Sequence, residues 1–126
     1  MAKVGDFSIG VDIESIARFK NLHRQRSQLF LAKIFTEDEL NYCFSKKPPS
    51  PHLAVRFAAK EAVVKAVGSL CKKLPALNEI EISHNAYGAP IATLRGYKIK
   101  ISLSHCDDKA IAFAVVEKNN ASRIQS

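Results

Sequence analysis

A glutamate and a lysine four residues apart are the residues of this chain best suited to chemistry. Glu61 and Lys65 lie within residues 56–65, which contain no Gly or Pro and therefore favour a helix. On a helix both side chains share one face beside Phe57 and Ala58, with no wide polar face around them. This setting suggests a divalent metal ion next to a phosphate-like anion. An ordinary surface ion pair, worth only about 0.2–0.5 kcal/mol, is the alternative.

Asp12 is a second candidate metal ligand. Residues 7–14 alternate between apolar and polar side chains, which predicts a half-buried strand, and Asp12, between Val11 and Ile13, is the acid that we select inside it. Gly10 precedes it, and a glycine there lets a ligand or another backbone come close. An Asp on a strand facing a Glu on a helix is a common way to hold Mg²⁺. The alternative is a capping or turn residue at the end of the strand.

A histidine closes another predicted strand. His105 follows Ser104 directly after the strand expected over residues 97–103, where it is well placed for phosphate contact or proton transfer. A lone histidine is more often a hydrogen-bonded structural residue. Both interpretations remain open at this point.

The net charge of +7 predicts a polyanionic partner. The segment between Ser15 and Thr36 carries five cations and no acid, namely Arg18, Lys20, Arg24, Arg26 and Lys33. It has no aromatic residues interleaved as in RNA-binding motifs and no zinc-finger spacing. The segment is either a solvated helix face or a docking surface.

The remaining composition predicts a cytoplasmic protein without a membrane span. Cys43, Cys71 and Cys106 are odd in number and form no C-x-x-C motif, as expected in a reducing compartment. No apolar run approaches the roughly 20 residues of a membrane helix. The first six residues are too polar for a signal peptide.

The pattern of elements predicts a single α+β domain over residues 1–126, with an antiparallel-rich sheet packed against one long helix and shorter helices. The first half is expected to contain a basic helical segment at 16–34, a helix opened by a Thr36–Glu39 capping box and running through Phe44, and a stiff proline loop at 46–51. A long helix should follow from about 52 to 69, with Gly68 as its C-cap. The second half is expected to contain strands at 80–83 and 91–94 around a turn at 85–90, a strand at 97–103, a central strand at 110–116 covered on both faces, and a loose tail at 117–126.

Five motifs occur in a recognisable order. They are Gly10-Val-Asp12-Ile, Arg18-Phe19, Arg56-Phe-Ala-Ala-Lys-Glu61-Ala-x-x-Lys65-Ala-x-Gly68, Asn85-x-x-Gly88-x-Pro90 and Ser102-Leu-Ser104-His105. From about Ile9 to Val116 the chain resembles the holo-[acyl-carrier-protein] synthases, the small bacterial class of 4′-phosphopantetheinyl transferases. One departure is Ala89, where the family usually has Lys.

The resemblance implies a reaction in fatty acid biosynthesis. The 4′-phosphopantetheine group of coenzyme A moves to a serine of apo-acyl carrier protein, and adenosine 3′,5′-bisphosphate is released. Asp12 and Glu61 are implied as ligands of Mg²⁺, with Mn²⁺ as a substitute, and Glu61, Lys65 and His105 as catalytic residues. The base that deprotonates the serine is either Glu61 or a metal-bound water.

The resemblance also implies the binding partners. The residues expected to bind coenzyme A are Arg56, Lys65, Gly88, Pro90, Ser104 and His105. Those expected to meet the acidic helix of the acyl carrier protein are Arg18, Arg24 and Arg26. The family is typically a homotrimer with active sites between protomers.

Two other functions are compatible with parts of the pattern. Asp12 with Glu61 and Lys65 also resembles a metal-dependent nuclease site, although nuclease acids and lysines usually lie two apart on a strand. The other alternative is a basic adaptor protein without enzymatic activity, but in that case the order of the five motifs would be a coincidence. We therefore expect a transferase that binds no nucleic acid.

Overall fold

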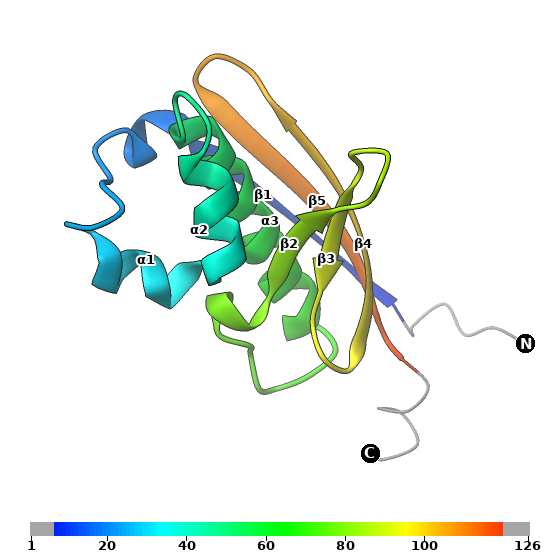
Figure 1. Cartoon of the computed structure of the whole chain (residues 1–126). Coiled ribbons are helices and arrows are strands. Elements are labelled where there is room, and N and C mark those ends of the chain that lie inside the picture. Colours follow the sequence, from blue (N-terminus) through cyan, green and yellow to red (C-terminus); the bar gives the residue numbers. More distant parts are fainter. Residues whose placement is uncertain (1–6, 120–126) are drawn as a thin grey trace, which may run out of the picture.

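A three-stranded antiparallel sheet and one long helix dominate the fold. The computed structural model describes residues 7–119. The sheet has the order β1 (Phe7–Ser15), β5 (Lys109–Lys118) and β4 (Tyr97–His105), and α3 (Ser50–Gly68) packs across one of its faces (Figure 1). The expected α+β class is confirmed.

The shorter elements flank this two-layer core. They are the 3₁₀ helix η2 (Ile16–Phe19), α1 (Gln28–Ile34), α2 (Glu37–Phe44), the 3₁₀ helix η3 (Leu77–Glu79), β2 (Glu81–His84) and β3 (Pro90–Thr93). Strands β2 and β3 form an antiparallel hairpin beside β4, and α2 lies between α1 and this hairpin, in contact with β2 and α3 (Figure 1).

The basic segment is less helical than expected. A continuous helix over 16–34 is wrong, because only η2 and the seven-residue α1 form, with turns between them. Ile16 and Phe19 are buried in the first, and Leu31 and Ile34 in the second. The polar residues between these pairs provide no apolar stripe that could hold a longer helix against the core.

The capping box that opens α2 is confirmed. Thr36 Oγ1 accepts a hydrogen bond from the backbone N–H of Glu39 at 3.3 Å, and Glu39 Oε1 accepts one from the Thr36 N–H at 2.8 Å. The same Glu39 carboxylate forms an ion pair with Lys60 of α3 at 2.7 Å. Both side chains are fully buried, so this pair ties α2 to the middle of α3.

Helix α3 lies at the centre of the core, because most of its side chains are small or branched and are buried by the surrounding elements. Its residues from Leu53 to Lys60 are all buried. The helix starts at Ser50, inside the loop expected at 46–51, with Pro51 in its first turn, where a missing N–H costs nothing. It ends at Gly68, but Gly68 does not adopt the left-handed conformation of a glycine C-cap, so that expectation is wrong.

Strand β1 presents its polar side to α3 and its apolar side outward. Gly10 is buried, and a Cβ atom there would lie only 2.0 Å from the carbonyl oxygen of Ala62. The missing side chain therefore lets the strand lie directly on the helix backbone. Asp12 and Glu14 follow on this inner side, while Val11 and Ile13 are at least half exposed. The alternation correctly predicted a strand.

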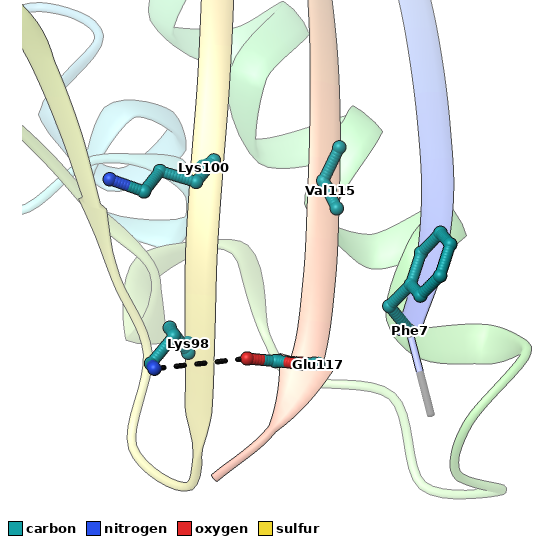
Figure 2. A pocket seen from close by; sticks show the side chains of 5 residues that line it. All are labelled: Phe7, Lys98, Lys100, Val115 and Glu117. Atoms are coloured by element: carbon teal, nitrogen blue, oxygen red, sulfur yellow. Dashed lines mark ion pairs between the residues drawn. The ribbon is translucent and has the colours of Figure 1, made fainter. Parts of the chain in front are cut away.

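The outer face of the sheet is uncovered in the described chain. Strand β5 is central, as expected, but only its inner side is buried, so the expectation of a strand covered on both faces is wrong for the single chain. The exposed apolar residues of this outer face are Phe7, Ile9, Val11, Ile13, Ile111 and Phe113. At its lower edge a pocket of about 270 Å³ lies between Phe7, Val115, Lys98, Lys100 and Glu117 (Figure 2).

The C-terminal boundary also differs from expectation. Strand β5 continues to Lys118, so Glu117 belongs to the sheet rather than to a tail. Residues 120–126 of the expected tail lie outside the described residues.

Candidate active site

Lys65 links α3 to β1 at the first cluster of predicted site residues. Its Nζ donates hydrogen bonds to Asp12 Oδ1 at 3.1 Å and to the Val11 carbonyl oxygen at 3.0 Å. Lys65 therefore pairs with Asp12 on the strand, and the interpretation of Glu61 and Lys65 as an ordinary ion pair along one helix is wrong. Glu61 is partly exposed and has no hydrogen-bond or ion-pair partner among residues 7–119.

Asp12 carries an unused ligand atom. Its Oδ2 is buried and receives no hydrogen bond from the described residues. A buried carboxylate oxygen without a donor is costly unless a cation or a proton occupies it, so the site fits a metal ion. No group of three or more His, Cys, Asp or Glu in the described part of the chain could hold a metal ion. Such an ion would thus take few protein ligands and the rest from water or phosphate, as Mg²⁺ does.

Glu14 is a second acid of β1 that the sequence analysis overlooked. It lies two residues after Asp12 and therefore on the same side of the strand. Burial, and then the neighbouring Asp12 carboxylate, raise the pKa of the Glu14 carboxyl to about 7, against a lowering effect of Arg18. A divalent cation would relieve this crowding of two acids.

Arg18 begins the predicted docking surface. Its Nη1 donates to Glu14 Oε1 at 2.8 Å, and its guanidinium carbon lies 5.1 Å from the ring centroid of Phe57 and 5.9 Å from that of Phe19. The Arg18 side chain is 58% exposed, so one side of the cation faces solvent.

The other two predicted docking arginines differ from each other. Arg24 Nη2 donates to Glu37 Oε1 at 2.8 Å and to Asn41, so part of its charge is compensated within the chain. Arg26 is exposed. The large apolar side chains of Leu29 and Phe30 are exposed on the adjoining α1, which adds apolar area to the basic surface.

Arg56 forms a second cluster. The residue is 3% exposed, its Nη1 donates to the His52 carbonyl oxygen, and its Nη2 lies 3.3 Å from His84 Nε2. Its guanidinium carbon lies 4.3 Å from the Tyr42 ring centroid, and its Nε is buried without a partner among the described residues. Asp38, Glu39 and Glu81 line the same pocket as Arg56, but no carboxylate in the described chain forms an ion pair with it, so an anionic ligand would compensate this charge.

The charge of Arg56 influences its neighbours. Burial, and then the Arg56 charge, lower the pKa of both His52 and His84. His105 at the end of β4 also lowers the pKa of His52, which places it near the start of α3. The electrostatics of this cluster therefore favour an anion, and neutral histidines in its absence.

The predicted nucleotide loop lies between β2 and β3. Gly88 has a φ of +83°, a conformation that favours glycine, and its N–H donates to the Asn85 carbonyl oxygen at 3.0 Å. The Asn85 side chain accepts hydrogen bonds from the N–H groups of Tyr87 and Ala89. Pro90 then begins β3. The loop is thus held by backbone hydrogen bonds and by the Asn85 side chain, and Ala89 contributes no charge.

The predicted residues do not meet in one place within a single chain. Arg56 and Glu61 are five residues apart on α3, a rotation of roughly 140° around the helix axis. The Arg56 cluster therefore lies on the other side of α3 from Asp12, Glu61 and Lys65. Ser104 is exposed on the outer face of the sheet, away from Asp12.

Several residues that shape the two clusters are not among those predicted from the sequence. Glu14, Tyr42 and His84 were not selected, because none stands in a dense motif. For Glu14, the spacing of two from Asp12 on a strand was the available signal. His84 and Tyr42 meet Arg56 only through folding, with their rings 4.9 Å apart, and no local spacing indicates that contact.

Comparison with known proteins agrees with this geometry. The family model described as "4′-phosphopantetheinyl transferase superfamily" matches residues 8–116. The chain therefore belongs to the 4′-phosphopantetheinyl transferase superfamily, as the resemblance predicted.

Within this superfamily, the similar curated relatives and solved structures are holo-[acyl-carrier-protein] synthases. A holo-[acyl-carrier-protein] synthase of Thermodesulfovibrio yellowstonii is 44% identical over 86% of this chain and 96% of its own length. One of Chlamydia muridarum is 44% identical over 93% of this chain and 99% of its own length. The crystal structure of the Helicobacter pylori synthase in complex with coenzyme A is 33% identical, covers 86% of this chain and 99% of that one, and has a TM-score of 0.73. The Bacillus anthracis synthase, in complex with "CoA (3',5'-ADP)", is 31% identical, covers 89% of this chain and 96% of that one, and has a TM-score of 0.72.

Proposed function

We propose that this chain transfers the 4′-phosphopantetheine group of coenzyme A to a serine of apo-acyl carrier protein, releasing adenosine 3′,5′-bisphosphate. The observation that carries the proposal is the arrangement across β1 and α3, where Lys65 reaches Asp12 beside the unpaired Glu61. Membership of the superfamily and the names of the relatives support the same activity. They favour the transferase over the nuclease and adaptor alternatives.

Asp12 and Glu61 are the residues we assign to Mg²⁺, with Mn²⁺ as a substitute. The buried and unpartnered Oδ2 of Asp12 supports this assignment. When bound, the ion would neutralise charge on the pyrophosphate of coenzyme A during transfer. Lys65 would contribute a phosphate contact from the ammonium group that it now shares with Asp12.

Glu61 is our candidate for the group that accepts the serine proton, directly or through a water. Its carboxylate is partly exposed and engaged by no cation in the described chain, so it is free to accept a proton at the open side of α3. We assign Arg56 and His105, with Gly88, Pro90 and Ser104, to coenzyme A. The uncompensated Arg56 charge supports an anionic ligand there.

We further propose a homotrimer in which the two clusters of neighbouring copies complete each site. The contiguous apolar outer face of the sheet supports association, because monomeric proteins rarely expose such a patch. The placement of Arg56 and Glu61 on different sides of α3 supports a site shared between copies. Arg18, Arg24 and Arg26 would face the acidic helix of the carrier protein.

We assign the protein to fatty acid biosynthesis in the cytoplasm. The three cysteines are free thiols, as a reducing compartment would keep them. No helix in the described part of the chain is long and apolar enough to cross a membrane.

Mass spectrometry tests the activity directly. Apo-acyl carrier protein incubated with the protein, coenzyme A and Mg²⁺ should gain the mass of one phosphopantetheine group, and EDTA should prevent the gain. Glu61→Gln should abolish transfer, whereas Glu79→Gln, which makes the same change at a glutamate that caps η3, should not. An unmodified carrier protein with the parent enzyme, or full transfer by Glu61→Gln, would contradict the proposal.

A further inference from the structure

A row of four charged side chains, two adjacent acids with a cation at each end, joins the proposed metal site to the docking surface. Lys65 pairs with Asp12, Asp12 lies beside Glu14, and Glu14 pairs with Arg18. The two acids are successive residues on the inner side of β1, so roughly 7 Å of extended backbone separates their Cα atoms. The first acid belongs to the proposed metal site, whereas the second contacts the arginine proposed to meet the carrier protein.

Glu14 holds Arg18 from a nearly buried position. Its side chain is 12% exposed, and Arg18 is the only cation paired with it among residues 7–119. Phe57 and Phe19 are buried and flank the same guanidinium. The position of Arg18 is therefore set by one hydrogen bond at 2.8 Å and two ring contacts, although more than half of its side chain reaches solvent.

An arginine fixed in this way is ordered before its partner arrives. A free arginine on a surface loses rotamer freedom when it binds, which weakens the complex, and a preordered one avoids much of that loss. It also presents its charge at a fixed distance from the reacting atoms, which matters because small displacements of a substrate slow transfer. Strand β1, paired with β5 along its whole length, provides the rigid support.

We propose that Glu14 is a positioning residue for the carrier protein, acting through Arg18 and aligning the docked carrier with Asp12. This inference rests on the proposed function and deepens it, because it adds a determinant of carrier recognition on the inner side of β1, behind the docking surface. It requires only that a Glu14 oxygen accepts the Arg18 hydrogen bond.

Steady-state kinetics of Glu14→Ala tests the inference. We expect kcat/KM for the acyl carrier protein to fall about fivefold, a loss of about 1 kcal/mol, while the affinity for coenzyme A stays within twofold. Glu14→Gln retains an oxygen that can accept from Arg18, so it should restore much of the loss. A purely structural role would instead weaken the binding of both substrates and lower the melting temperature.

The Arg18→Ala background provides the decisive comparison. If Glu14 acts through Arg18, then Glu14→Ala should lower kcat/KM for the carrier no further in that background. The full fivefold loss there, an unchanged kcat/KM in Glu14→Ala alone, or equal losses for both substrates would overturn the inference while leaving the proposed function intact. Absence of transfer by the parent enzyme would overturn both.

Discussion

Replacing Lys60 with methionine should destabilise this domain more than any surface change. Lys60 is fully buried, pairs with Glu39 at 2.7 Å and donates to the carbonyl oxygens of Leu77 at 3.0 Å and of Ile80. Burial lowers the pKa of Lys60, whereas Glu39 counteracts that effect. The partners of the ammonium group therefore stabilise its charged form against the effect of burial.

The loss in the free energy of unfolding can be estimated from the unpaired Glu39 carboxylate that Lys60→Met would leave in the core. Glu39 would keep the hydrogen bonds from the N–H groups of Thr36 and Ile82 but lose its cation, although its side chain is fully buried. Removing one partner of a buried pair costs about 3–5 kcal/mol, against a total of about 5–15 kcal/mol for a small domain. The double variant Lys60→Met/Glu39→Gln should be less destabilised than the sum of the two single variants, because no uncompensated charge remains.

Urea denaturation followed by far-UV circular dichroism measures these changes, since the chain has no tryptophan for fluorescence. Protein concentration must be equal for all variants, because association would add to stability. A Lys60→Met variant with the midpoint and slope of the parent would refute the reasoning. So would a double variant that loses at least the sum of the two single losses.

Three further predictions concern the two faces of β1 and the docking surface. Arg18→Glu should raise the KM for the carrier protein about tenfold, or about 1.4 kcal/mol, in low salt and leave coenzyme A affinity nearly unchanged; equal losses for both substrates would exclude a docking role. Ile13→Asp places a charge on the apolar outer face and should yield monomers by light scattering, whereas Leu74→Asp, at an exposed apolar residue elsewhere, should not. In EDTA, the free energy of unfolding of the parent should fall relative to that of Glu14→Gln as the pH rises from about 4.5 to about 7. The reason is that in this range the native state still holds a proton on Glu14, whereas the unfolded chain has released it. A difference in unfolding free energy that stays constant with pH would contradict the raised pKa.

The elements with local signals were predicted well from the sequence. The alternation over 97–103, the capping box at Thr36 and the turn around Gly88 each depend on residues that interact with near neighbours. The continuous helix predicted for the basic segment at 16–34 was wrong, because the charge pattern does not show whether enough apolar residues lie on one side of a helix to pack against the core.

The orientation of β1 illustrates a limit of periodicity. Alternation predicts that one side of a strand is buried, and the usual expectation is that the apolar side faces the core. Here Gly10 allows contact with Ala62 on the polar side, so the helix covers Asp12 while Ile13 points outward. Likewise, the motif around Glu61 predicts a set of site residues, but only the fold shows that Arg56 lies on another side of α3 from Glu61.

The close contact between Gly10 and the Ala62 carbonyl has a consequence for the alignment of β1 with its neighbours. A shift of one residue would turn Asp12 and Glu14 outward and bring Val11 and Ile13 against α3. Any residue other than glycine brought to the contact would collide with the helix backbone, since even a Cβ atom lies 2.0 Å from that oxygen. One missing side chain therefore excludes the slipped pairing, and by doing so it keeps the two acids on the side of the strand that α3 covers and the apolar residues on the side that we propose for assembly.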